Sequence, residues 1–314
     1  MIFSSNDRDF VFMSLIGFST LHADLDLRRP MVPVAAAGGA DATVLEALRI
    51  ALDRGWFAPI VCGEDAAIRR IAREIGVSLD GFTIIEADGN DSARAAVAEV
   101  KSGRASILMK GQIPTPDLMH AILDPEHGLR SGRAVAQVVL MEITRDGRRF
   151  LMADTGVMVR PKLPRKIEIL LEAVEVARAL GEPTPRVAMM AASEKIIDGM
   201  PETFDAAELA RRSLHGEFPG IVIQGPLSFD LAYDPSAAVK KGVSGDVVGA
   251  ADVMIFPDLS SANLTVKAIM VTADCRFGGV LRGTTHPVAF MSRADDVPTR
   301  LNSLALAERL LGRA

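Results

Sequence analysis

A group of polar side chains follows the short apolar run Val253–Phe256. Within the next few helical turns come a carboxylate at Asp258, a carboxamide at Asn263 and an ammonium group at Lys267, with two serines among them. Ammonium, carboxamide and hydroxyl groups donate hydrogen bonds to phosphate oxygens, and a carboxylate accepts them from hydroxyl groups. Helical spacing keeps these residues within about three turns of one another. The group therefore predicts a site for phosphate oxygens and hydroxyls.

The surrounding elements predict an α/β fold. Ile221–Ile223 and Val253–Phe256 are short enough for buried strands, and each is followed by turn residues and then a helical pattern. From Met31 to Gly111, strand-like runs alternate with amphipathic helices, which is typical of a parallel sheet covered by helices. Ligands bind at the carboxyl ends of such strands, where loops converge and helix N-termini present free N–H groups.

The middle of the chain predicts a hairpin followed by further strand and helix units. Residues 135–160 indicate two strands around a turn at Asp146-Gly147. Helices are expected over Arg165–Leu180 and Phe204–Ser213, with a strand at Val187–Ala191 between them. A last helix is expected over Thr299–Leu311. We find no internal repeat and no low-complexity tract.

Composition excludes several classes of protein. The 314 residues are 49% hydrophobic and 24% charged, which fits a soluble globular protein with room for two domains. A net charge of -5 argues against a nucleic-acid partner. Cys62 and Cys275 indicate reduced cytoplasmic thiols packed in the core. The apolar run Phe10–Thr20 has an acidic flank and is too short to cross a membrane, so we expect a cytoplasmic extension.

Three segments resemble the phosphate acetyltransferases and phosphate butyryltransferases. They are GPLSFDLA, FPDLSSANLTVKA and MSRADDVPTRLNSLALA, the last at 291–307. The resemblance begins near Met31, and residues 186–209 are closer to the butyryltransferase branch. It implies a two-domain architecture similar to the isocitrate and isopropylmalate dehydrogenases, with mostly parallel sheets flanked by helices, and a homodimer. We expect an extension over 1–30, a first domain over 31–143 plus 278–314, and a second over 144–277.

The resemblance also implies substrate-binding residues. The segments MKG-x-x-x-T and GLR-[ST]-G, which line the cleft between the domains in the family, assign Lys110, Thr115 and Arg130, with Arg133 as a further phosphate candidate. Asp154 matches the aspartate of a third segment, although Ala153 and Met158 replace its usual threonine and asparagine. Asp258, Asn263 and Lys267 match the family's PD-x-x-x-[GA]N-x-x-x-K segment.

Ser292 and Arg293 match the family's active-site serine and arginine. An arginine can hold phosphate through two parallel hydrogen bonds, and a hydroxyl can stabilise an oxyanion or bind the thiol. Without the resemblance, this pair would only be expected to cap the last helix. The acetyltransferase branch has an aspartate seven residues after the serine, proposed as the base for the thiol, but this chain has Thr299. Asp295 or Asp296 can substitute, or a nearby cation can stabilise the thiolate without a base.

The implied reaction exchanges a short acyl group between coenzyme A and inorganic phosphate, with acyl phosphate as the other reactant. Acetyl, propionyl and butyryl groups all remain open. Coenzyme A is a substrate, and no cofactor or metal is expected, because the five histidines show no ligand spacing. Two alternatives remain. One is an NAD-dependent hydroxyacid dehydrogenase of similar fold, and the other is a non-catalytic protein that binds acyl-CoA or phosphate.

Overall fold

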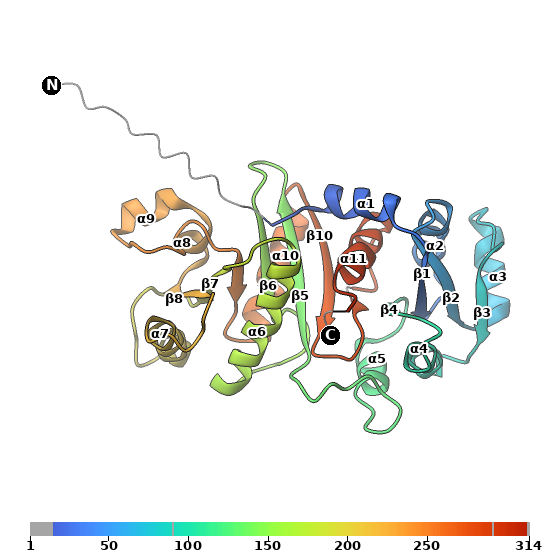
Figure 1. The fold of residues 1–314 in the computed structure, drawn as a ribbon, viewed down its shortest axis with the longest axis horizontal. Helices are drawn as coiled ribbons and strands as arrows, with labels where there is room; N and C mark the ends of the chain where they lie inside the picture. Colours follow the sequence, from blue (N-terminus) through green and yellow to red (C-terminus); the bar gives the residue numbers. More distant parts are fainter. Residues whose placement is uncertain (1–14, 90, 291, 313–314) are drawn as a thin grey trace.

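The computed structural model describes residues 15–312 except 90 and 291 (Figure 1). Within these residues the strands form one 11-stranded sheet in the order β3-β2-β1-β4-β11-β10-β5-β6-β9-β7-β8. Figure 1 shows β3 toward one end of the molecule and β8 toward the other, with helices along the sheet between them. The prediction of an α/β fold with a mostly parallel sheet is confirmed.

The first five strands of this order are parallel to one another. In register, Ala37 at the end of the first strand of the chain lies opposite Lys110 at the end of the fourth. The block is completed by a two-residue strand that pairs with the fourth. Their bounds are β1 Val32–Ala37, β2 Phe57–Gly63, β3 Thr83–Glu86, β4 Ile107–Lys110 and β11 Val288–Ala289.

The centre of the sheet is antiparallel, and its far side is again parallel. The predicted hairpin at Asp146-Gly147 is confirmed by an antiparallel pair. The strands are β10 Cys275–Arg282, β5 Ala136–Ile143, β6 Arg149–Ala153, β9 Val253–Ile255, β7 Arg186–Met190 and β8 Val222–Leu227. From β4 across the sheet to β6, the direction of the strands reverses three times: at β10, at β5 and at β6. The two parallel blocks therefore run in opposite directions.

Helices cover both faces of the sheet because strand side chains alternate between them. Val138 and Leu140 join one core cluster, whereas Val139 and Met141 join another. The helices are α1 Phe18–Leu27, α2 Ala42–Asp53, α3 Asp65–Glu74, α4 Asp91–Lys101, α5 Thr115–Ile122, α6 Leu163–Ala179, α7 Pro201–Leu214, α8 Phe229–Tyr233, α9 Pro235–Lys241, α10 Leu259–Thr272 and α11 Val297–Arg309. Helices α1, α2, α6, α7 and α11 pack on the first face, and α4, α5, α8 and α10 on the second.

Part of the expected N-terminal extension belongs to the core. Helix α1 buries Phe18, Leu21 and Leu25 in the same cluster as α11. Figure 1 shows it lying above α11. Residues 1–14, which include the start of the apolar run Phe10–Thr20, lie outside the described part of the chain.

Two local expectations differ from the structure. Strand β8 continues through Gly225-Pro226 to Leu227, where the sequence indicated a turn. Strand β10 was not expected from the sequence. A Cβ on Gly278 would lie 2.9 Å from the Asn302 carbonyl carbon, so a side chain there would push α11 away from the sheet. The expected domain boundary at Gly278 thus falls within β10, while the one at Ile143 falls at the end of β5.

Candidate active site

A buried acid and a buried amine face the same small cavity. Lys110 is the last residue of β4, and Asp295 lies just before α11. Both side chains line the cavity together with Arg300, and both are buried, Asp295 with only 7% of its surface exposed. The Lys110 Nζ also lies 6.0 Å from the centre of the ring of Phe290, the residue directly after β11. The structure thus joins two sequence-predicted residues that are 185 positions apart in the chain.

Burial moves the pKa values of these two groups toward neutrality. Desolvation lowers the pKa of Lys110 to about 8, opposed by the charge of Asp295 and reinforced by Arg300 and Arg293. Desolvation raises the pKa of Asp295 to about 7, opposed by the charges of Arg300 and Lys110. A carboxyl group with a pKa near 7 is suited to accept and return protons at physiological pH. The arrangement can therefore perform general acid and base chemistry.

Ser292 and Arg293 lie on the loop directly before Asp295. Both are exposed, and the loop that carries them is held by a 3.4 Å hydrogen bond from the Asp295 N–H to the Ser292 carbonyl. Arg293 is close enough for its charge to lower the pKa of Lys110. An exposed cation beside a buried acid and base is well placed to meet an anion from solvent. Residue 291 lies outside the described residues.

The structure separates the two candidate bases. The Asp296 carboxylate accepts a 2.9 Å hydrogen bond from the Thr299 N–H and so caps the N-terminus of α11. Asp295 faces the cavity instead. Thr299, at the position of the acetyltransferase aspartate, is buried in α11. Of the neighbouring carboxylates, Asp295 is therefore the one that shares a cavity with Lys110.

Arg300 was missed by the sequence analysis. It lies in α11, where every residue from Thr299 to Glu308 is buried. Its Nε donates to the Thr43 hydroxyl at 2.8 Å, and its Nη1 donates to the Lys110 carbonyl at 3.3 Å. The only hint in the sequence is an arginine directly before the apolar run LNSLALA, and burial of the whole helix cannot be read from that pattern.

A second group of predicted residues surrounds the loop after β6. Asp154 is buried, and its carboxylate accepts hydrogen bonds from the N–H groups of Gly156 at 3.0 Å, Val157 at 3.2 Å and Met158 at 2.7 Å. Burial raises the pKa of Asp154, although these amides favour its charged form. Asn263 donates to the Thr155 carbonyl of the same loop at 3.0 Å. Asp154 and Asn263 therefore order this loop. Met158 replaces the asparagine that is usual in the family, yet its backbone N–H still donates to Asp154.

Gln137 connects the two groups. Its Nε2 donates to the Phe290 carbonyl at 2.9 Å, next to the Lys110 cavity. Its backbone N–H donates to the Asp154 Oδ1 at 2.9 Å. A Cβ on Gly156 would lie 2.0 Å from the Gln137 Oε1, so the loop packs directly on this amide. The two groups sit at the ends of oppositely running strands, and both contact one residue of β5, Gln137, which the sequence analysis did not single out.

The remaining predicted residues belong to α5, to the loop after it and to α10 with its N-cap. The Asp258 carboxylate caps α10 by accepting from the Ser261 N–H at 2.8 Å, and Lys267 is exposed on that helix. Thr115 begins α5 and is half-buried, and Arg130 is exposed beside a backbone bridge to Thr284. Arg133, the further phosphate candidate, instead pairs with the buried Glu172 at 3.0 Å.

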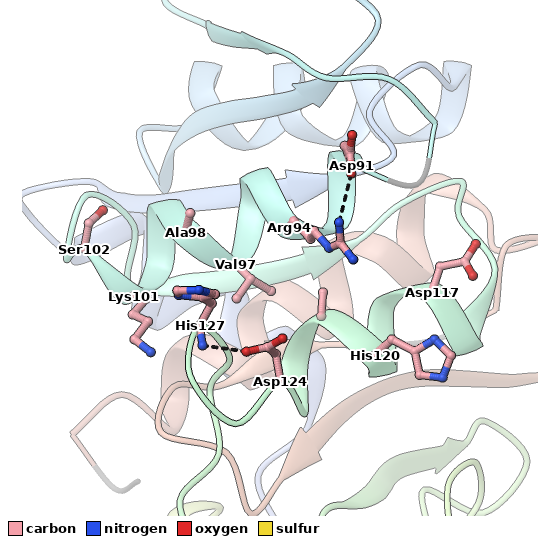
Figure 2. A pocket seen from close by; sticks show the side chains of 11 residues that line it. Asp91, Arg94, Val97, Ala98, Lys101, Ser102, Asp117, His120, Asp124 and His127 are labelled. Atoms are coloured by element: carbon pink, nitrogen blue, oxygen red, sulfur yellow. Dashed lines mark hydrogen bonds and ion pairs between the residues drawn. The ribbon is translucent and has the colours of Figure 1, made fainter.

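A groove of 880 Å³ between α4 and α5 is a separate feature, and none of the predicted site residues lines it (Figure 2). Figure 2 shows Arg94 turned toward Asp91, and these two form an ion pair at 3.5 Å. Asp124 accepts hydrogen bonds from the N–H groups of Glu126 at 2.9 Å and His127 at 2.7 Å. These contacts are local to the two helices and the turn after α5.

The described residues contain no group of three His, Cys, Asp or Glu side chains that could hold a metal ion. Acid and base chemistry at Lys110 and Asp295 does not call for one. In the part of the chain that the structure describes, no helix has both the length and the apolar character needed to cross a membrane.

Comparison with known proteins identifies the family. A family model described as phosphate acetyl/butaryl transferase matches residues 89–308. Phosphate butyryltransferase of Clostridium acetobutylicum is 38% identical over 285 residues, covering 90% of this chain and 95% of that protein. The chain belongs to the phosphate acetyl/butyryl transferase family. The resemblance carried by the three sequence segments is thereby confirmed.

Relatives of both names match the chain. Phosphate acetyltransferase of Thermotoga maritima is 35% identical over 274 residues, covering 87% of this chain and 93% of that protein. Among solved structures, a branched-chain phosphotransacylase from Enterococcus faecalis superposes with a TM-score of 0.79 at 29% identity, covering 90% of this chain and 99% of that one. A putative 4-hydroxythreonine-4-phosphate dehydrogenase from Salmonella typhimurium, at 12% identity and a TM-score of 0.54, shares the fold alone, with coverage of 90% of this chain and 100% of that one.

Proposed function

We propose that this protein transfers a short-chain acyl group between coenzyme A and inorganic phosphate. The observation that carries the proposal is the buried pair of Lys110 and Asp295 in one cavity, inside segments that match the family. Burial brings both pKa values near neutrality, to about 8 and about 7. A group that accepts a proton from a thiol and returns it works best when its pKa lies near the operating pH.

In the direction of acyl-CoA formation, Asp295 accepts the proton of the coenzyme A thiol. A free thiol has a pKa of about 8.5, so a carboxylate with a pKa of about 7 is a well-matched base. The thiolate sulfur then forms a bond to the acyl carbonyl carbon, and the bond from that carbon to the phosphate oxygen breaks. Phosphate leaves with the electron pair. In reverse, phosphate attacks the thioester and the Asp295 carboxyl group returns the proton to the departing thiolate.

The exposed residues beside this pair bind the anion and the oxyanion. The Arg293 guanidinium can hold phosphate through two parallel hydrogen bonds, and the Lys110 ammonium adds a positive charge from the floor of the cavity. The Ser292 hydroxyl is on the same loop and donates to the oxygen that becomes negative in the tetrahedral intermediate. Thr115, in the first turn of the helix after β4, extends the anion site toward solvent, and Arg130 offers a further exposed positive charge.

We assign coenzyme A to the side of the site formed by the loop after β6 and the start of α10. Asp154 and Asn263 order this loop, and Asp258 orders the first turn of α10. Lys267 is exposed on α10 and offers a positive charge for the phosphates of coenzyme A. Gln137 contacts both this loop and the segment beside the Lys110 cavity, which supports an orientation of coenzyme A with its thiol end toward Asp295.

The decisive experiment measures thiol release from acetyl-, propionyl- and butyryl-CoA with and without phosphate. Phosphate-dependent release from at least one of them is the expected result, and the ratios of kcat/KM identify the acyl group. Binding of coenzyme A without any phosphate-dependent release would instead support a non-catalytic homologue. Reduction of NAD by a hydroxyacid in the presence of a divalent metal would support the dehydrogenase alternative.

We further propose a homodimeric, cytoplasmic enzyme. Helix α10 exposes the apolar side chains Leu264 and Val271 by 70% and 85%, and a second copy of this chain would cover them. Light scattering at the mass of a monomer would contradict the dimer. Cys62 is a free thiol in the core, and burial raises its pKa to about 12, which suits an unreactive thiol in a reducing compartment.

A further inference from the structure

Arg300 lies at the junction of three segments that are far apart in the chain. It is on α11, and it contacts the Lys110 carbonyl at the end of β4 and the Thr43 hydroxyl in the first turn of α2. Thr43 in turn donates to the Asp41 carboxylate at 2.6 Å, and Asp41 caps α2 through the Val44 N–H at 3.0 Å. One guanidinium therefore ties the start of α2 to the end of β4.

The charge of Arg300 is incompletely compensated. Its side chain is only 2% exposed, and the nearest carboxylate oxygen, on Asp41, is 3.7 Å from its Nη2. That Nη2 is buried and has no hydrogen-bond partner within the described residues. A guanidinium stays protonated even in such surroundings, so it is a fixed positive charge on the wall of the cavity that Asp295 faces.

We propose that Arg300 is a positioning residue for the acyl transfer, clamping the end of β4 to the start of α2 and placing a fixed positive charge beside Asp295. The inference rests on the proposed function through the role of Asp295 as the base. Arg300 itself lies behind Lys110 in the core and acts through the two groups that meet the substrates.

The charged groups around the cavity define what Arg300 does. Asp41 faces it from the start of α2, Lys110 from β4, and Asp295 and Asp296 from the turn before α11. The positive charge of Arg300 opposes the rise that burial causes in the pKa of Asp295, and it adds to the fall in the pKa of Lys110. Removing this charge should therefore leave Asp295 protonated to a higher pH and Lys110 charged to a higher pH. An opposite charge at close range shifts a pKa by about one unit or more.

The test compares Arg300→Met, Arg300→Lys and wild type in two measurements. The first is the pH profile of kcat/KM for phosphate-dependent thiol release. The second is the titration of the Asp295 carboxyl group, followed by NMR in protein labelled with ¹³C-aspartate and assigned with Asp295→Asn. In thiol release the protonated Asp295 carboxyl group donates the proton, so its pKa sets the basic limb of the profile. We expect Arg300→Met to move this basic limb and the Asp295 titration upward together by about one pH unit. Arg300→Lys keeps the charge, so both should stay near wild type while kcat falls several-fold from loss of the clamp.

Arg309 provides a matched control on the same helix. Its Nε also donates to a backbone carbonyl, that of Ala179 at 2.8 Å, and its Nη1 also lies near a carboxylate, that of Asp24 at 3.6 Å. Arg309→Met should leave the pH profile and the Asp295 titration unchanged. The proposal would be overturned if Arg309→Met shifted the Asp295 titration as much as Arg300→Met does. It would also be overturned if Arg300→Met lost activity while both its pH profile and its Asp295 titration stayed at the wild-type positions.

Thr43→Val keeps the inference testable if Arg300→Met does not fold. This change removes the hydroxyl that accepts from the Arg300 Nε while preserving the shape of the side chain. We expect an upward shift smaller than one pH unit and a lower kcat, and wild-type behaviour of both Thr43→Val and Arg300→Lys would rule out the clamp. If the wild type shows no thiol release, the proposed function fails, and the NMR titration still decides whether Arg300 controls Asp295.

Discussion

Replacing Asp295 with asparagine should make the protein more stable and much less active. Burial raises the pKa of Asp295 from 3.8 to about 7, so the folded protein holds this proton more tightly than the unfolded chain does. Below pH 3.8 both states are protonated and the group contributes nothing. As the pH rises from 3.8 to about 7 the unfolded chain loses the proton first, and the free energy of unfolding falls across this window.

The size of the effect follows from the shift. About three pKa units at 1.36 kcal/mol each correspond to about 4 kcal/mol by pH 8, as an upper value. The asparagine side chain carries no charge at any of these pH values, so Asp295→Asn should exceed wild type in stability at pH 8 by up to that amount and match it near pH 4. In thiol release Asp295 is the proton donor, and its loss should lower kcat/KM about a hundredfold or more. Urea unfolding at several pH values and the thiol-release assay measure the two effects.

Asp296→Asn is the matched control for this substitution. Asp296 is exposed and caps α11, and asparagine caps a helix about as well as aspartate does. Its stability should follow wild type at every pH, and its turnover should stay within a few-fold. If the stability of Asp295→Asn follows the wild-type pH dependence, Asp295 is not a buried acid with a raised pKa. If the variant keeps wild-type turnover, Asp295 is not the catalytic acid and base.

Other substitutions test the rest of the site. Arg293→Ala should lower the rate about a hundredfold, with a weaker response to phosphate and an unchanged melting temperature, because an exposed arginine contributes little to the core. The rate of Arg293→Lys should fall between those of wild type and Arg293→Ala, and near-wild-type turnover of Arg293→Ala would show that the residue does not hold phosphate. Gly156→Ala should clash with the Gln137 amide and raise the KM for coenzyme A. Gly147→Ala, in the hairpin turn, should leave that KM unchanged. Asn263→Ala should cost about 1 kcal/mol in urea unfolding, and an unchanged midpoint would show that its bond to Thr155 is dispensable.

The sequence alone determined the architecture and the main site segments. Alternating strand and helix patterns predicted the α/β sheet, because apolar periodicity records which side of each element is buried. The Asp146-Gly147 signal predicted the hairpin, which the structure confirms. The spacing of the family segments led to Lys110 and Asp295 as candidates, since the residue types that perform acid and base chemistry are visible in a sequence. Helix bounds were close, with α6 observed at Leu163–Ala179.

Only the tertiary structure decided how those candidates work. Asp295 and Asp296 are equivalent as letters, yet one faces a buried cavity and the other caps a helix. The difference comes from desolvation and from charges supplied by β4 and α11, which are distant in the chain. Gln137 and Arg300 were missed for the same reason: their roles depend on partners more than 100 residues away. The local sequence pattern indicates which residues of one helix or strand are buried together. The pKa of a side chain and its hydrogen bonds depend instead on which groups the fold places next to it.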